Sequence, residues 1–201
     1  HLGWFAINSS ISNENDLTYG DGLNFENPYM FGGNDLYATW AIARGCGLEL
    51  EKYVDYKTDY INSTFVRESE RFVSEYTVSE INIFEKEDKA EIKKSIMKNG
   101  ALMASYYDST SYYNNSNKGF CFYDDYNSSS NHATLIIGWD DDFSKDNFGI
   151  SKPSSNGAWL CRNTRGTSWG DDGYFWMSYE TVSLKRIVSF VLVLVFVFSF
   201  V

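Results

Sequence analysis

The sequence holds few of the residues that bind metals or build disulfide scaffolds. Its 201 residues include three cysteines and two histidines. The cysteines (Cys46, Cys121 and Cys161) allow at most one disulfide bond, which excludes a small disulfide-rich scaffold. No Cys-x-x-Cys or His-x-x-x-His pair is present, so we predict no metal site and no cofactor. Cys161 falls within a predicted strand and is expected to be a buried small hydrophobe.

Positive charge is also scarce. The chain has 17 Lys and Arg residues against 27 Asp and Glu residues, a formal net charge of −10 at pH 7. This balance argues against a nucleic-acid partner, because binding to phosphates depends on Lys and Arg. Aromatic residues are abundant at 18%, and each can bury roughly 150–250 Å². Length and composition therefore predict a single globular domain, or the larger part of one.

Two stretches each place a polar side chain at the edge of an apolar run. His132 precedes the run Ala133–Gly138, and Asn163 follows the run Ala158–Cys161 closely. Apolar runs bounded by Gly and Asn are typical of strands, and we expect these two strands to be neighbours in one sheet. His132 and Asn163 would then meet across the ladder. A cysteine nucleophile needs such a pair: a His to take its proton and a third group to hold the imidazole.

These stretches resemble two motifs of the papain-like cysteine peptidases. NHATLIIGWD, from Asn131, is similar to the family's histidine motif. AWLCRNTRGTSWGDDGY, from Ala158, is similar to its asparagine motif, and His and Asn lie 163 − 132 = 31 residues apart. FGGNDLYATWAIARGCGLELEKYVDY and IKKSIMKNGALMASYYD are weaker likenesses. The resemblance covers roughly residues 1–180.

The resemblance implies a fold and an activity. The fold is α+β with two lobes: an incomplete helical left lobe over 1–70 and an antiparallel, β-barrel-like right lobe over 71–180. The activity is proteolysis by thiolate attack on a peptide or protein substrate, without a cofactor, in an extracellular or cell-surface protein. The implied roles are catalytic for His132 and Asn163, shielding of that pair for Trp169, and lining of the substrate cleft for Gly32, Gly33 and Asn131.

Two departures from the family set limits on this expectation. The family places its nucleophile about 130–150 residues before the His, and no cysteine stands near residue 1. We therefore expect a chain that lacks the nucleophile-bearing segment and is inactive as given. In addition, Thr164-Arg165-Gly166 replaces Ser-Trp-Gly. Because Arg cannot cover the His–Asn bond as Trp does, we expect Arg165→Trp to speed a restored enzyme.

Two alternatives remain open at this point. One is a degenerate, non-catalytic peptidase-like domain that binds peptides or protein partners. The other is a different Cys–His acyl-transfer enzyme, such as a transglutaminase-like or amidase fold, which would need Asp or His in place of Asn163.

The remaining segments carry ordinary signals. Asp88–Lys98 has an apolar stripe with acids early and lysines late, which predicts an amphipathic helix. Alternation and β-branched residues predict strands at Tyr76–Phe84 and Ala101–Tyr107. A helix is expected at Leu36–Ala43, a surface loop at Glu51–Glu70 and a long polar loop at Ser109–Ser130.

The last segment, 181–201, differs from the rest. Residues 187–201 are apolar except for two serines, a run of 201 − 187 + 1 = 15 residues. A spanning helix needs about 20 such residues, so membrane association through this run is disfavoured. The run is interpreted as a marginal anchor, a buried terminal strand or an altered sequence, and the third is favoured here.

Overall fold

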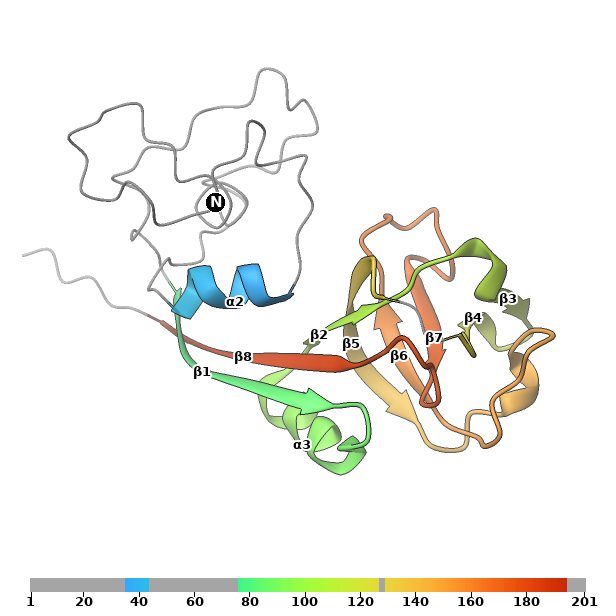
Figure 1. The fold of residues 1–201 in the computed structure, drawn as a ribbon, viewed down its shortest axis with the longest axis horizontal. Helices are drawn as coiled ribbons and strands as arrows, with labels where there is room; N and C mark the ends of the chain where they lie inside the picture. The colour runs from blue at the N-terminus through green and yellow to red at the C-terminus, as the bar shows by residue number, and fades with distance from the viewer. Residues whose placement is uncertain (1–34, 44–75, 127–128, 195–201) are drawn as a thin grey trace, which may run out of the picture. The chain divides into compact units, whose positions relative to one another are not determined.

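The computed structural model describes residues 35–43, 76–126 and 129–194 (Figure 1). Two compact units are distinguished along the chain. One comprises His1–Ile81 with Val191–Val201, and the other comprises Asn82–Phe190. The second unit contains His132 and Asn163 and is described throughout except for residues 127–128.

The strands among the described residues form one sheet of eight strands in the order β1-β8-β2-β5-β6-β7-β4-β3. The strands are β1 Tyr76–Glu85, β2 Leu102–Tyr106, β3 Tyr113–Ser116, β4 Gly119–Phe122, β5 His132–Asp140, β6 Ala158–Arg162, β7 Tyr174–Ser178 and β8 Arg186–Leu194. The helices are α2 Asp35–Ala43 and α3 Lys89–Asn99, with short 3-10 turns η3 Thr110–Tyr112 and η4 Lys145–Asn147. The predicted α+β class is confirmed.

The expected antiparallel, barrel-like arrangement needs correction. The sheet is open, with β1 and β3 as its end strands among the described residues, and β4 pairs with β7 in parallel. The physical reason lies in the β3–β4 hairpin, which pairs internally from Tyr113 with Phe122 to Ser116 with Gly119. Strand β4 of this hairpin pairs with β7 on the side away from β6, so the sheet continues outward through β4 and β3 and stays open.

The hairpin falls inside the segment Ser109–Ser130, where a polar loop was predicted, and that prediction is wrong. Three aromatic side chains explain the strands. Tyr113, Phe120 and Phe122 pack with ring centroids 4.8 Å apart in two pairs, Tyr113–Phe120 and Tyr113–Phe122. Phe122 is fully buried. Aromatic pairs across two strands stabilise a hairpin even where Asn and Ser fill the other positions.

Helix α3 matches the predicted amphipathic helix. Its inward side buries Ile92 and Ser95, and it ends at Gly100, whose φ of 90° suits glycine. The Gly100 N–H donates to the Ile96 carbonyl at 3.0 Å. Lys93 reaches Asp141, just beyond β5, with an Nζ–Oδ1 distance of 2.5 Å. The helix is therefore fixed both by burial and by an ion pair.

Strand β8 accounts for the first part of the apolar tail. Ile187 and Val188 pair with Ala104 and Met103 of β2, and both are almost fully buried. The structure thus places the start of the run inside the sheet, as a buried strand, whereas residues 195–201 lie outside the described part. Among the described residues, no helix is long and apolar enough to cross a membrane.

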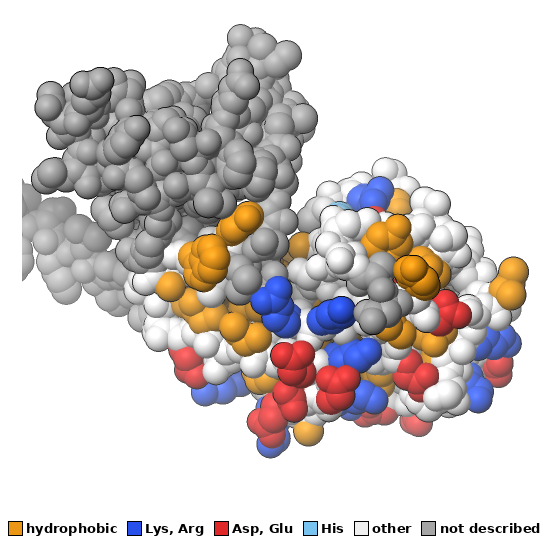
Figure 2. Space-filling model, viewed as in Figure 1, with side chains coloured by type: hydrophobic (Ala, Val, Ile, Leu, Met, Phe, Trp, Pro, Cys, Tyr) orange, Lys and Arg blue, Asp and Glu red, His pale blue; other side chains and the backbone are white. Residues whose placement is uncertain are grey.

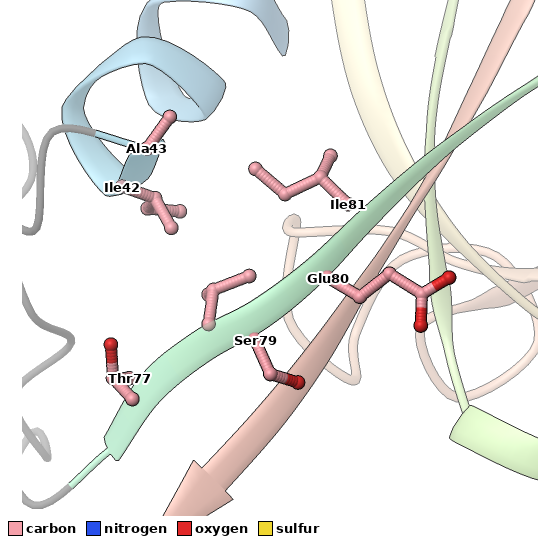
Figure 3. A pocket seen from close by; sticks show the side chains of 7 residues that line it. Ile42, Ala43, Thr77, Ser79, Glu80 and Ile81 are labelled. Atoms are coloured by element: carbon pink, nitrogen blue, oxygen red, sulfur yellow. The ribbon is translucent and has the colours of Figure 1, made fainter.

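The other unit contributes α2, which matches the helix predicted at Leu36–Ala43. A cavity of about 480 Å³ lies between α2 and β1, lined by Ile42, Ala43 and residues 77–81 (Figure 3). Ile81 extends from β1 toward the helix, whereas Glu80 points to the other side of the strand. Of the predicted site residues that the structure describes, none lines this cavity. Gly32, Gly33 and the loop predicted at Glu51–Glu70 lie outside the described residues.

Candidate active site

The pairing of β5 with β6 brings the two predicted polar residues together. The strands are antiparallel neighbours, with Leu135 opposite Arg162 and Ile136 opposite Cys161 (Figure 1). Because His132 opens β5 and Asn163 follows β6, both stand at the same end of the ladder. The Thr134 hydroxyl, which is buried, donates to the Arg162 carbonyl at 2.7 Å and locks the strands at this end.

The two side chains are directly hydrogen-bonded, and the direction of the bond is fixed. Asn163 Oδ1 accepts from the Thr164 backbone N–H at 2.8 Å. A backbone N–H can only donate, so the atom facing it is the amide oxygen. The same oxygen lies 2.8 Å from His132 Nε2. His132 Nε2 therefore carries a proton and donates it, which leaves Nδ1 as the basic nitrogen of the neutral ring.

Asn163 is held rigidly. Its side chain is 5% exposed, and its backbone N–H donates to the Gly173 carbonyl at 2.9 Å. Gly173 adopts a φ of 90°, and a Cβ there would meet the Gly166 carbonyl oxygen at 3.1 Å. Glycine is therefore required to close the loop after Asn163. The Asn163 Nδ2 group is buried without a hydrogen-bond acceptor among the described residues.

On its other side, the His132 ring lies against Tyr106. The two residues are register partners across β2 and β5, and their ring centroids are 5.7 Å apart in an edge-on contact. Tyr106 is fully buried, and its hydroxyl lies 2.7 Å from the Tyr113 hydroxyl. Burial raises the pKa of Tyr106 well above its ordinary value. The phenol therefore stays neutral, and the His132 ring packs against an uncharged aromatic side chain.

Trp169, the predicted shielding residue, belongs to an aromatic cluster that is connected to Tyr106 through Tyr113. Its ring makes edge-on contacts with Phe120 at 5.1 Å, Tyr113 at 5.4 Å and Phe175 at 5.6 Å. Tyr113 joins this cluster to Tyr106, and Tyr106 in turn contacts His132. The structure thus places Trp169 in the packing that supports the pair, and its shielding role stays a prediction.

Arg165 does not stand free beside the pair. Its guanidinium forms an ion pair with the Asp108 carboxylate, and its Cζ lies 5.9 Å from the centre of the Trp169 ring. Asp108 in turn contacts Asn131, the predicted cleft residue: the Asp108 N–H donates to Asn131 Oδ1 at 2.7 Å. Asn131 is exposed and directly precedes His132.

Neither described cysteine has the properties of a nucleophile. Cys121 and Cys161 are fully buried and unpaired. Burial raises the pKa of both thiols, which disfavours the reactive thiolate. No group of His, Cys, Asp and Glu that could hold a metal occurs among the described residues. Acidic and basic side chains are interspersed on the described surface in view (Figure 2).

The residues that surround the His132–Asn163 pair were not predicted from the sequence. Tyr106 and Asp108 come from outside the two quoted motifs, and the β2–β5 register brings them close to the pair. Thr134 lies within the histidine motif, but its bond to the Arg162 carbonyl depends on the β5–β6 pairing. Tyr106 was signalled weakly, as an aromatic residue at the end of a predicted strand. Nothing in the sequence singled out Asp108.

An α+β fold that holds a His–Asn pair at the shared end of two antiparallel strands is typical of the papain class of cysteine peptidases. The model of the papain family of cysteine proteases matches residues 25–192, and the chain belongs to that family. The match includes most of strand β8.

Solved structures agree with this assignment. The clostridial cysteine protease Cwp84 after propeptide cleavage is 27% identical with a TM-score of 0.77, covering 98% of this chain and 47% of that one. The cysteine protease and lectin-like domains of Cwp84 from Clostridium difficile give 27% identity and a TM-score of 0.76, covering 98% and 42%. The bromelain protease of Ananas comosus, 16% identical with a TM-score of 0.55 over 79% and 69%, shares the fold. The chain spans less than half the length of the two clostridial chains. No curated protein matches.

Proposed function

We propose that His132 and Asn163 are the base and the orienting residue of a cysteine peptidase that cleaves peptide or protein substrates. The observation that carries this proposal is the bond from His132 Nε2–H to the buried Asn163 Oδ1 at 2.8 Å. This bond sets the tautomer in which Nδ1 is the proton acceptor. A general base must present a free basic nitrogen in a fixed direction, and His132 does so.

The geometry supports the following sequence of steps. His132 Nδ1 takes the proton of a cysteine thiol, and the thiolate attacks the carbonyl carbon of the substrate peptide bond. The imidazolium then gives this proton to the nitrogen of the leaving amine, and the C–N bond breaks to leave an acyl-enzyme. Water, deprotonated by the same Nδ1, hydrolyses the thioester and releases the acid. Throughout, Asn163 Oδ1 accepts from Nε2–H and keeps the ring in place.

The nucleophile in this proposal comes from outside the described residues. Cys121 and Cys161 are buried with raised pKa values. Cys46 stands between Gly45 and Gly47, directly after the α2 segment, in a position that does not correspond to the family's nucleophile. We therefore propose that residues 1–201 alone do not hydrolyse peptides. A cell-surface location is also proposed, because Cwp84 is described as a surface-layer-associated protein.

The test supplies the nucleophile. A chimera joins the nucleophile-bearing segment of the clostridial relative to residue 1, and hydrolysis of a fluorogenic peptide is measured with and without a thiol-alkylating reagent. We expect thiol-dependent hydrolysis that His132→Ala abolishes. Asn163→Ala should lower kcat by roughly tenfold to hundredfold with little change in KM, because misorientation of the base costs that much. Lys152→Gln, which breaks an exposed ion pair elsewhere, is the matched control.

Two results would contradict the proposal. Thiol-dependent hydrolysis by residues 1–201 alone would show that the nucleophile lies within them. Peptide binding by the folded chimera without any turnover would favour the non-catalytic, peptide-binding alternative.

A further inference from the structure

One ion pair joins the two segments that carry the His–Asn pair. The Arg165 guanidinium, two residues after Asn163, binds the Asp108 carboxylate, two residues after the end of β2. The Arg165 side chain is 46% exposed, but that of Asp108 is 10% exposed. A carboxylate so far removed from water is costly unless a cation or hydrogen-bond donors compensate for it. Arg165 is its cationic partner in the described structure.

The backbone of Asp108 is tied to the segment before His132. Asn131 Oδ1 accepts from the Asp108 N–H at 2.7 Å, and Asn131 Nδ2 donates to the Asp108 carbonyl at 3.1 Å. The Asn131 N–H also donates to the Tyr106 carbonyl at 3.0 Å. Asp108 therefore holds Asn131 through its main chain and Arg165 through its side chain. These two contacts link the residue before His132 to the loop after Asn163.

The surroundings of the ion pair favour its persistence. Trp169 lies beneath the guanidinium, with its ring centre 5.9 Å from Cζ. Tyr113 packs on Trp169 with ring centroids 5.4 Å apart, and its hydroxyl lies 2.7 Å from that of Tyr106. The Asp108 carboxylate is thus largely removed from water, and the guanidinium that binds it lies over an aromatic ring. Such a partly enclosed pair is stronger than a fully exposed surface ion pair.

We propose that Asp108 and Arg165 are positioning residues, which keep His132 and Asn163 in hydrogen-bonding register by connecting their two segments. They act through the bond from His132 Nε2–H to Asn163 Oδ1 and do not contact the reacting atoms. The proposal deepens the proposed function, because its importance for catalysis depends on His132 being the base. The link itself can be tested whether or not the protein is a peptidase.

The measurement uses nitrogen-15 NMR of the imidazole rings in residues 1–201, at alkaline pH where histidine is neutral. The sequence has two histidines, His1 and His132, which makes assignment direct. We expect His132 to be in the Nε2–H form, with this proton protected from exchange with water. Asp108→Asn removes only the charge, since both bonds to Asn131 use the Asp108 backbone. It should speed exchange of the proton roughly fivefold, the equivalent of one partly buried ion pair.

Three further variants complete the test. Arg165→Gln should have an effect at least as large as that of Asp108→Asn, because it also leaves the Asp108 carboxylate without its cation. The double variant should be no worse than Arg165→Gln, because the interaction is already lost and no uncompensated charge remains. Arg165→Lys keeps the cation and should recover much of the protection. Lys152→Gln breaks the exposed Lys152–Asp146 pair and should leave the His132 proton unchanged.

Unchanged exchange and tautomer in both Asp108→Asn and Arg165→Gln would overturn the proposal. Unfolding of both variants, with Lys152→Gln folded, would also overturn it by assigning the ion pair to general stability. These outcomes are separate from the chimera experiment, in which loss of the proposed function would appear as absent hydrolysis. An intact NMR result with no hydrolysis would retain the link and reject the peptidase.

Discussion

The role expected of Arg165 changes once its ion-pair partner, Asp108, is known. From the motif alone it replaces a Trp that covers the His–Asn bond, and Arg165→Trp is expected to speed catalysis. In the structure its guanidinium binds Asp108, whose side chain is 10% exposed. Substitution by Trp would add an apolar cover but leave that carboxylate without its cation. The loss of a partner from a nearly buried charge outweighs the gain in shielding.

The structure therefore reverses the prediction for Arg165→Trp. In the chimera that carries a nucleophile, we expect this variant to lower kcat, by roughly fivefold for the loss of one ion pair. Asp108→Asn combined with Arg165→Trp should recover at least part of kcat, because no uncompensated charge then remains. Steady-state kinetics of the three proteins provide the check. A single Arg165→Trp variant faster than the parent would show that the cover matters more than the charge.

Asp124 is a second residue whose environment yields a prediction. It is fully buried, and it accepts hydrogen bonds from the Ser183 N–H at 3.2 Å and from the Ser183 hydroxyl. Burial raises the pKa of its carboxyl group above the ordinary range. The native state thus holds a proton that the unfolded state has released, over a window that starts at about pH 3.9 and ends at the raised pKa. Within that window the free energy of unfolding falls as pH rises.

Asp124→Asn should remove this dependence, because the amide does not titrate. We expect the free energy of unfolding of the variant, relative to the parent, to increase as pH is raised from about 4 across the window. Urea denaturation at several pH values measures this difference. A difference that is constant or decreases with pH would contradict the assigned direction of the pKa shift.

At the scale of the residue, the sequence could predict that His132 and Asn163 meet, but not which residues support the pair. His132 and Asn163 stand at edges of apolar runs, and simple strand signals were enough to bring them together, as the Nε2–Oδ1 distance of 2.8 Å confirms. Asp108 lies in a polar stretch after β2, where many acids are merely solvated. Its role depends on contacts with Asn131 and Arg165, 23 and 57 residues away in the chain. Local patterns carry no signal for contacts so distant in sequence.

Among the elements, the loop from Asn163 to Gly173 depends most on glycine. Gly166 and Gly170 both have positive φ, 76° and 61°. A Cβ on Gly166 would meet nothing within 4 Å, whereas one on Gly170 would lie 2.7 Å from the Tyr174 carbonyl oxygen. Both positions need a positive φ, but only Gly166 has room for a side-chain methyl group. The two glycines therefore form a matched pair of test sites.

We expect Gly166→Ala to cost about 1 kcal/mol, from the left-handed backbone alone. Gly170→Ala should cost roughly 1–3 kcal/mol more, because the close backbone oxygen forces the loop to shift. Denaturant unfolding of both variants gives the difference directly. Equal losses would mean that the loop absorbs the clash without strain.

The elements themselves were predicted unevenly. Helix α3 and strands β2, β5 and β6 lie close to their predicted bounds, because each has a clear period or a dense apolar run. The hairpin of β3 and β4 was not predicted, because Asn114, Asn115 and Ser116 fill most of β3 and give it no alternation of apolar and polar residues. Its aromatic residues Tyr113 and Phe122 lie on different strands, and only the pairing brings them together. Its strands are specified by aromatic contacts with β7 and Trp169, which are tertiary interactions that override local propensity.

At the scale of the whole molecule, the last described strand occupies an interior place in the sheet. Strand β8 stands between β1 and β2 in the order, and Ile187 and Val188 are almost fully buried beside β2. We expect Ile187→Ala to cost roughly 2–5 kcal/mol. Leu192→Ala, on the same strand but at a side chain that is 50% exposed, should cost well under half as much. Chemical denaturation of the two variants measures both losses of stability. Equal losses would contradict the prediction, because the buried Ile187 side chain would then stabilise the fold no more than the half-exposed Leu192.

The interior position of β8 also has a consequence for protein synthesis. A ribosome produces about 5–20 residues per second, and β2 leaves it more than 80 residues before Ile187 and Val188, its partners in β8. Until those residues emerge, one edge of β2 lacks its native neighbour, and an unpaired edge readily pairs with another chain. The sheet cannot be completed during most of translation. We therefore expect nascent chains of this protein to be clients of ribosome-associated chaperones, and to become resistant to protease only after residue 190 has left the exit tunnel.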